Sequence, residues 1–145
     1  MFKIVAIFIL FFFSQNLTAE EYFLTLRNDK VNLRLGPSFD YPIKIIYKKK
    51  FLPVLIKDKS ENFRKIQDHE NNSGWIHISQ LSKKKSGIAT DDIILFSRAT
   101  LYSRPLANIK AGRLLIISKC KVNWCKVKTE EYSGWVEKKV IWGRL

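Results

Sequence analysis

Residues that could carry chemistry are scarce in this chain. Its 145 residues include two cysteines, two histidines and one methionine. A zinc site would need two ligands beyond Cys120 and Cys125, and the only histidines, His69 and His77, lie more than forty positions before them. The cysteines do not form a C-x-x-C motif, which disfavours thiol-exchange catalysis. These absences predict a protein without a metal site and without a cofactor.

Sequence patterns for catalysis are missing as well. Paired carboxylates, a glycine-rich phosphate loop and a Ser-His-Asp arrangement are not apparent. Cys125 could act as a nucleophile only beside a histidine, and no histidine follows His77 in the sequence. His77 follows Trp75-Ile76 in a strand-like segment, which favours a structural role. The sequence therefore predicts that the protein is not an enzyme.

Long apolar runs are absent except at the start of the chain. Lys3 precedes ten apolar residues, Ile4 to Phe13, and the small Ala19 stands before Glu20. This pattern is typical of a cleaved signal peptide, here residues 1–19. Ten residues that rise about 1.5 Å each cannot cross a hydrocarbon layer of about 30 Å. We therefore expect an exported, periplasmic chain that begins at Glu20 and has no integral membrane span.

Acidic residues are also few. The chain has 13 aspartates and glutamates but 26 lysines and arginines, which gives a net charge of +13. Two runs concentrate the positive charge, Lys48-Lys49-Lys50 and Lys83-Lys84-Lys85. Such runs attract anionic lipid, glycan or nucleic acid. Lysine is also the basic residue that an AT-rich genome favours without any selection for binding. Both interpretations stay open, although export makes nucleic acid an unsuitable partner.

A short pattern occurs twice and divides the chain. Gly74-Trp75-Ile76 returns sixty positions later as Gly134-Trp135-Val136. Each copy follows a segment of aromatic, basic and apolar residues, Phe63-Arg64-Lys65-Ile66 in one case and Trp124-Cys125-Lys126-Val127 in the other. This repetition predicts two copies of one small β unit. We expect the cores of these units to contain Leu33, Trp75 and Trp135.

Helical periodicity is absent after the leader, and short strand-like segments take its place. Val31, Leu33 and Leu35 alternate with polar residues, which is typical of a strand. The other predicted strands of the first copy are residues 43–47, 51–57, 63–67 and 74–77, with a lead-in strand at 22–26. Ile78 to Leu81 has room for one helical turn. The predicted fold class is all-β, with small antiparallel barrels.

Several motifs of the first copy stand in a recognisable order, namely Val31-Asn32-Leu33-Arg34, Gly36-Pro37, Tyr41-Pro42 and Gly74-Trp75-Ile76-His77. In this order they resemble the bacterial SH3-like domain, a small β-barrel common in exported cell-envelope proteins. The resemblance implies two SH3-like β-barrels in tandem. We place the first at residues 22–82, a linker at 83–87, and a second, degenerate barrel at 88–145.

The second copy matches the pattern less well. Thr100 to Pro105 takes the place of Asn32 to Pro37 in this alignment. On that basis 37 positions separate Pro37 from Gly74, and 29 separate Pro105 from Gly134, so the second copy is eight residues shorter. The missing residues fall near 107–112. The sequence leaves open whether a strand is absent or a loop is trimmed.

Cys120 and Cys125 flank a four-residue turn, which in an exported chain predicts a disulfide. If the flanking segments are antiparallel strands, the two cysteines lie directly opposite each other.

The resemblance implies a function in binding a cell-wall peptide or a protein partner of the envelope, with peptidoglycan itself as one candidate partner. A ligand groove on the first barrel is predicted from Arg34, Tyr41, Tyr47 and His77. Two alternatives remain: an electrostatic adaptor that binds anionic lipid or glycan through the lysine runs, and a structural module that docks through exposed strand edges.

Overall fold

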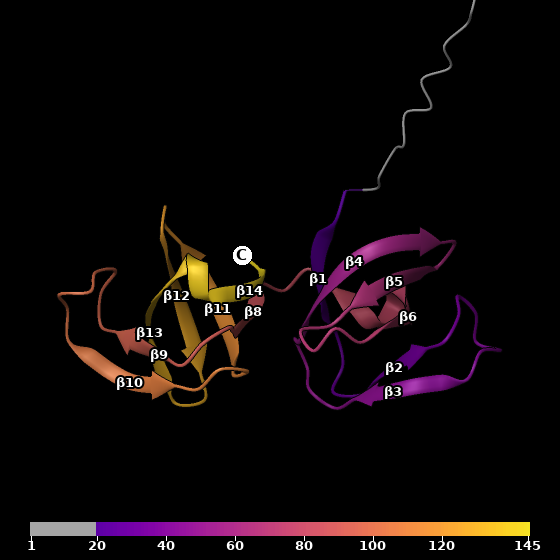
Figure 1. Cartoon of the computed structure of the whole chain (residues 1–145), viewed down its shortest axis with the longest axis horizontal. Coiled ribbons are helices and arrows are strands. Elements are labelled where there is room, and N and C mark those ends of the chain that lie inside the picture. The colour runs from indigo at the N-terminus through magenta and orange to yellow at the C-terminus, as the bar shows by residue number, and fades with distance from the viewer. Residues whose placement is uncertain (1–19) are drawn as a thin grey trace, which may run out of the picture.

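The computed structural model describes residues 20–145, and the predicted signal peptide, residues 1–19, lies outside the described residues. The described chain forms two β-barrels side by side, joined by a short connection (Figure 1). The predicted all-β class with two small barrels in tandem is confirmed. No helix within residues 20–145 is long and apolar enough to cross a membrane.

The first barrel has seven strands rather than the five or six predicted. They are β1 (Tyr22–Leu26), β2 (Val31–Arg34), β3 (Ile43–Tyr47), β4 (Pro53–Ser60), β5 (Phe63–Gln67), β6 (Ser73–His77) and β7 (Leu81–Ser82), with the 3-10 turn η1 (Ile78–Gln80) before β7. Their order in the sheet is β3-β2-β6-β5-β4-β1-β7. The lead-in strand at 22–26 and the helical turn after residue 77 are thus confirmed.

The second barrel repeats the first strand for strand. It consists of β8 (Ser86–Ala89), β9 (Ile93–Phe96), β10 (Pro105–Ile109), β11 (Leu114–Cys120), β12 (Trp124–Thr129), β13 (Tyr132–Glu137), the turn η2 (Lys138–Val140) and β14 (Ile141–Arg144). The sheet order β10-β9-β13-β12-β11-β8-β14 has the same connectivity as the first. The second barrel is therefore complete, and no strand is missing.

The alignment of the second copy on Pro105 was wrong. Arg34 pairs with Trp75 in the first barrel and Phe96 pairs with Trp135 in the second, so β9 corresponds to β2. These partners are 41 and 39 positions apart, a difference of two residues rather than eight. Pro105 begins β10, at the end of the strand order, where a missing backbone N–H is tolerated.

The predicted linker at 83–87 is also too long. Ser86 and Gly87 are buried and begin β8, where they pair with Ile116 and Leu115 of β11. Only three lysines remain between β7 and β8. These two small residues fit between neighbouring strands, since a Cβ on Gly87 would lie 2.1 Å from Ile141 Cγ2 on β14.

Strand alternation decides which residues form the first core. Leu33 on β2 and Ile76 on β6 are both fully buried in one apolar cluster, which confirms the prediction for Leu33. Trp75 precedes Ile76 and therefore points the other way, so it is only half-buried and lies outside that cluster. The prediction that Trp75 is a core residue was wrong.

Trp135 in the second barrel is buried, with 9% of its surface exposed, but it too lies outside the apolar cluster. The ammonium groups of Lys119 and Lys121 stand 5.8 and 5.0 Å from its ring centroid. Its burial therefore comes partly from lysine side chains on the outer face of the sheet, while the adjacent Val136 faces the core.

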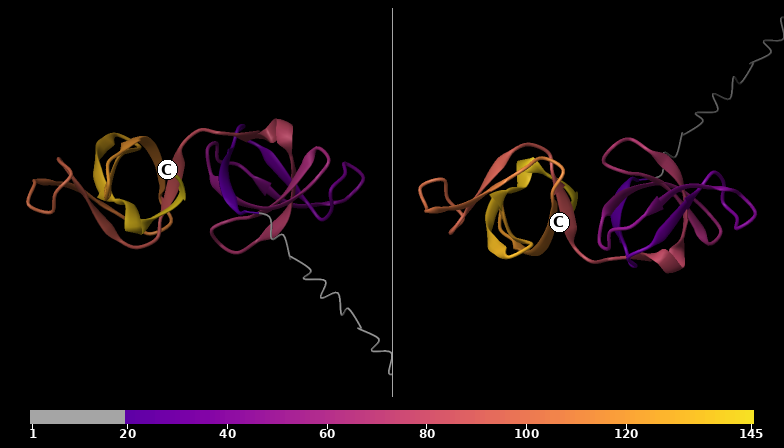
Figure 2. Two further views of the ribbon diagram at one scale, coloured as in Figure 1. Left: turned by 90° about the horizontal axis from the view of Figure 1, so that it is seen from above. Right: turned by 90° about the horizontal axis from the view of Figure 1, so that it is seen from below.

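The two barrels touch through β1 and β4 of the first and β8 and β14 of the second. Figure 2 shows the two barrels side by side from above and from below. The rings of Phe23 and Trp142 meet edge to face at 4.8 Å between centroids. Arg144 Nη1 donates a hydrogen bond of 2.8 Å to the carbonyl of Phe23. Polar and aromatic contacts therefore join the two barrels at this junction.

The predicted disulfide is present. Cys120 and Cys125 face each other across β11 and β12 and are bonded, with 4.0 Å between their Cα atoms. The bond closes the hairpin that carries Asn123 and Trp124.

Removal of the disulfide in the double variant Cys120→Ser, Cys125→Ser is expected to lower the free energy of unfolding by about 2 kcal/mol, because the bond closes only a short loop. Urea unfolding of the variant and the wild type measures this difference. Alkylation of the non-reduced protein followed by mass spectrometry is the control, and two labelled thiols would contradict the assignment.

Candidate functional site

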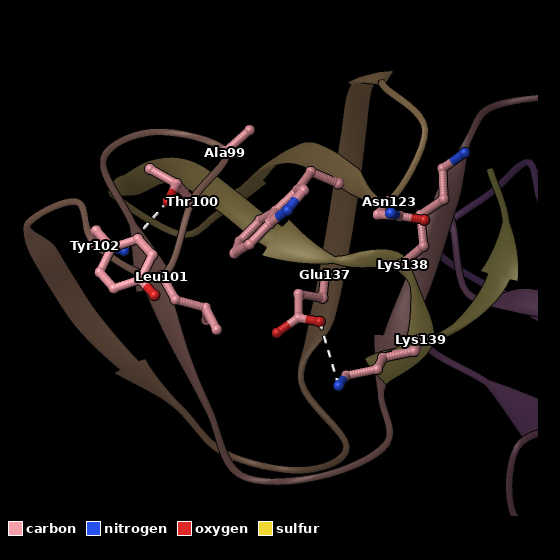
Figure 3. A pocket seen from close by; sticks show the side chains of 9 residues that line it. Ala99, Thr100, Leu101, Tyr102, Asn123, Glu137, Lys138 and Lys139 are labelled. Atoms are coloured by element: carbon pink, nitrogen blue, oxygen red, sulfur yellow. Dashed lines mark hydrogen bonds and ion pairs between the residues drawn. The ribbon is translucent and has the colours of Figure 1, made fainter.

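A groove of about 510 Å³ lies on the second barrel (Figure 3). The loop from β9 to β10, the hairpin from β11 to β12, and the end of β13 with η2 meet around it. The lining residues are Ala99, Thr100, Leu101, Tyr102, Asn123, Trp124, Glu137, Lys138 and Lys139.

Trp124 forms one wall of this groove, and the strands position it. It is the first residue of β12, within the disulfide-closed hairpin, and it pairs with Glu137 of β13. Its ring meets Phe96 edge to face at 5.9 Å, which holds the indole while leaving it half-buried. A fixed, partly open indole is a suitable surface for an apolar ligand group.

The opposite wall is the β9–β10 loop, whose shape is set by buried Ser103. The Ser103 hydroxyl donates to the carbonyl of Thr100 at 2.7 Å and accepts from the N–H of Arg98 at 3.2 Å. Leu101 and Tyr102 at the tip of this loop are 59% and 99% exposed. The loop thus carries two large apolar side chains that its own barrel does not cover.

Charges of both signs line the end of the groove. Glu137 forms an ion pair with Lys139 at 3.3 Å, whereas the side chain of Lys138 points away from this pair, past Asn123 (Figure 3). The groove therefore combines an aromatic wall with a paired carboxylate and ammonium group, and Lys138 completes the lining. No group of three or more His, Cys, Asp or Glu side chains within residues 20–145 is placed to hold a metal ion.

The first barrel has the same loop with the same backbone hydrogen bonds. Leu35 N–H donates to the Pro42 carbonyl at 3.1 Å, as Ser97 N–H does to the Arg104 carbonyl at 2.9 Å. This correspondence places Phe39 where the second barrel has Leu101.

Phe39 occupies its own barrel's groove. Its ring centroid lies 5.2 Å from that of Phe63 and 5.1 Å from that of His77. Phe63 and His77 pair across β5 and β6, as Trp124 and Glu137 do across β12 and β13. The groove wall of the first barrel is thus covered by a phenylalanine of its own loop.

The structure brings together three of the four residues predicted to line a groove. Arg34 Nη1 donates to the carbonyls of Phe39 and Tyr41 at 3.1 and 2.9 Å, and so holds the loop in place. The Tyr41 ring lies over Gly36, and His77 stacks beside Phe39. These contacts shape the loop around Phe39.

Tyr47, the fourth predicted residue, lies at the other end of the β2–β3 hairpin. Its hydroxyl donates a 2.8 Å hydrogen bond to the carboxylate of Asp68, and its ring packs against the first core. Burial, followed by the neighbouring Asp68 carboxylate, raises the pKa of Tyr47 above its ordinary value. Tyr47 is thus part of the barrel's own structure rather than of a groove.

Sequence reasoning missed Trp124 and Leu101 as groove residues. A signal for Trp124 was present, because it opens the same aromatic-basic-apolar segment that Phe63 opens in the first copy. Leu101 carried no comparable signal, since an apolar residue in a loop becomes informative only when the facing wall is known.

Seven antiparallel strands around one apolar cluster, with a 3-10 turn before the last strand, define each half of the chain as a small SH3-like barrel. The model of the family described as "Bacterial SH3 domain" matches residues 27–83 and again residues 90–143. The chain therefore belongs to the bacterial SH3 domain family.

Comparison with other proteins adds two solved structures. "Structure of NlpC2 from Trichomonas vaginalis" is 11% identical with a TM-score of 0.39, over 85% of this chain and 48% of that one. "Structure of NlpC1 from Trichomonas vaginalis" is 11% identical with a TM-score of 0.38, over 84% and 45%. The chain thus spans about half the length of these proteins. No curated protein matches the chain.

Proposed function

We propose that the protein is an exported, non-enzymatic binding module that holds an extended peptide of the cell envelope in the groove of its second barrel. The peptide belongs either to the cell wall or to an envelope protein. One observation carries this proposal: the loop that covers the groove wall of the first barrel with Phe39 leaves the equivalent wall of the second barrel open beside Trp124.

The chemistry of the groove supports a peptide ligand. Aromatic walls accept apolar or proline-like stretches of extended peptides, and flanking charges select their ends or side chains. Lys138 and Lys139 suit a carboxylate, and Glu137 suits an amino group. Short wall peptides carry both kinds of group. In this proposal the second barrel binds the peptide, and the first barrel has a supporting structural role.

Substitution of Trp124 by alanine is expected to weaken binding to purified peptidoglycan sacculi at least about tenfold, because central aromatic residues dominate the binding energy of such sites. Co-sedimentation at rising salt measures this, and groove binding should persist where charge attraction fades. Trp75→Ala is the matched control, since Trp75 is also half-buried but belongs to the first barrel.

A second variant tests the same idea without removing a side chain. Leu101→Phe should place a ring against Trp124, as Phe39 lies against Phe63, and so reduce binding while the melting temperature is kept. If the Trp124→Ala and Leu101→Phe variants both bound sacculi as strongly as the wild type, the proposed groove would be contradicted. Binding that disappears with salt in the wild type would favour the electrostatic alternative.

A further inference from the structure

The two lysine runs, far apart in the sequence, come together near the junction of the barrels. Lys50 Nζ lies 4.9 Å from the ring centroid of Phe51, and Lys84 Nζ lies 5.7 Å from the same centroid. All six lysines of the two runs are exposed. One aromatic ring is therefore shared by both runs, and we call Lys48–Lys50, Phe51 and Lys83–Lys85 together the lysine face.

The second run is held in place although it joins two barrels. The backbone carbonyls of Lys83–Lys85 each accept a hydrogen bond, in order from Arg144 Nε at 3.1 Å, Thr25 Oγ1 at 2.9 Å and the N–H of Ile117 at 3.1 Å. These donors come from β14, β1 and β11, so both barrels contribute. The charges of this run are thus presented on an ordered backbone.

Phe51 occupies a backbone conformation that a bulky residue rarely adopts. Its φ is 66°, and its N–H donates to the carbonyl of Leu26 at 2.9 Å. The equivalent residue of the second barrel is Gly112, with φ 87° and the matching hydrogen bond to Ala89 at 2.8 Å. Glycine accepts this conformation without cost, whereas phenylalanine is strained there. The first barrel therefore keeps an aromatic ring at a position where the fold itself favours glycine.

The positive charge of the lysine face is not neutralised within the protein. The ion pairs formed among residues 20–145 involve Lys57, His69, Lys110, Arg113 and Lys139, and none of the six lysines takes part. Two ammonium groups beside one aromatic ring, with the other four lysines of the runs exposed, suit an anionic partner with an apolar component.

We propose that the lysine face docks on the surface of an anionic lipid bilayer. Lysines are point charges without the forked geometry that grips a single phosphate, so the face suits a spread of negative charge. A bilayer offers anionic headgroups for the lysines and an apolar boundary for the Phe51 ring. An anionic polysaccharide offers only the first, which is why the ring favours the bilayer.

Co-sedimentation with vesicles tests the proposal, using the chain from Glu20 to Leu145. The wild type is expected to bind vesicles of phosphatidylcholine and phosphatidylglycerol but not phosphatidylcholine alone. Replacement of either run by glutamine, at Lys48–Lys50 or Lys83–Lys85, should lower partitioning about 100-fold, at about 1 kcal/mol for each lysine. A matched control replaces Lys59, Lys65 and Lys128, which are exposed elsewhere on the two barrels, and should lose much less.

Phe51→Gly separates a functional ring from a structural one. It removes the ring and relieves the positive φ, so the melting temperature should be kept or raised while vesicle binding falls severalfold. Equal losses in the control and in the lysine-run variants would overturn the proposal, because net charge alone would then explain binding. The proposal would also be overturned if the protein did not bind vesicles but bound sacculi through the same lysines. That result would assign the lysine face to an anionic polymer.

Discussion

Ile76→Ala is expected to lower the free energy of unfolding of the first barrel by about 2–5 kcal/mol, because it truncates a fully buried side chain. Ile76 packs in the apolar cluster with Leu33 and Ile66, all at 0% exposure. The strand order places β6 between β2 and β5, so a cavity at this position affects both neighbours. Urea unfolding of the wild type and the variant measures the loss.

Trp75→Ala is the informative comparison, although tryptophan is the larger residue. Trp75 is half-buried on the outer face, so its removal should cost only about 1–2 kcal/mol in lost apolar contact. The smaller residue of the pair thus has the larger effect. A loss at Trp75 that equals the loss at Ile76 would contradict the assignment of the inner and outer faces of β6.

Gly134→Ala is expected to destabilise the second barrel by about 3 kcal/mol or more, because the added methyl group has no space. A Cβ at this position would lie 2.5 Å from the carbonyl oxygen of Phe96 and 2.9 Å from Leu95 Cγ. Both atoms belong to β9, which crosses β13 closely at this point. Since the nearest atom is backbone, the contact cannot be relieved by a side-chain rotation.

Thermal unfolding compares this variant with Gly112→Ala. A Cβ added at Gly112 would meet no atom within 4 Å, but the φ of 87° makes alanine unfavourable there by about 1 kcal/mol. Gly134→Ala thus measures the cost of a steric clash, and Gly112→Ala measures the cost of an unfavourable backbone conformation. A Gly134→Ala protein as stable as the wild type would show that the strands can move apart, and the repeated Gly-Trp pattern would need another explanation.

The close contact at Gly134 explains why the Gly-Trp motif correctly predicted two copies of one β unit. In both barrels the glycine lies where the strand before the groove loop passes closest, and a Cβ on Gly74 would lie 2.8 Å from the carbonyl of Arg34. A motif that is required by backbone contact is visible in the sequence of each copy. The motif does not reveal which side of the strand faces inward, and this is why Trp75 was assigned to the core.

The sequence by itself determined the features that depend on local spacing: the all-β class, the repeat, the family and the bond between Cys120 and Cys125. The alternation of residues within a strand and the short turn between Cys120 and Cys125 suffice to predict these features, because the residues concerned are near each other in the chain. Only the tertiary structure decided which barrel keeps an open groove, since it packs the Phe39 ring against Phe63 and leaves Leu101 lining an open groove with Trp124. It also decided that both lysine runs meet at Phe51, because strand pairing between distant segments brings them together.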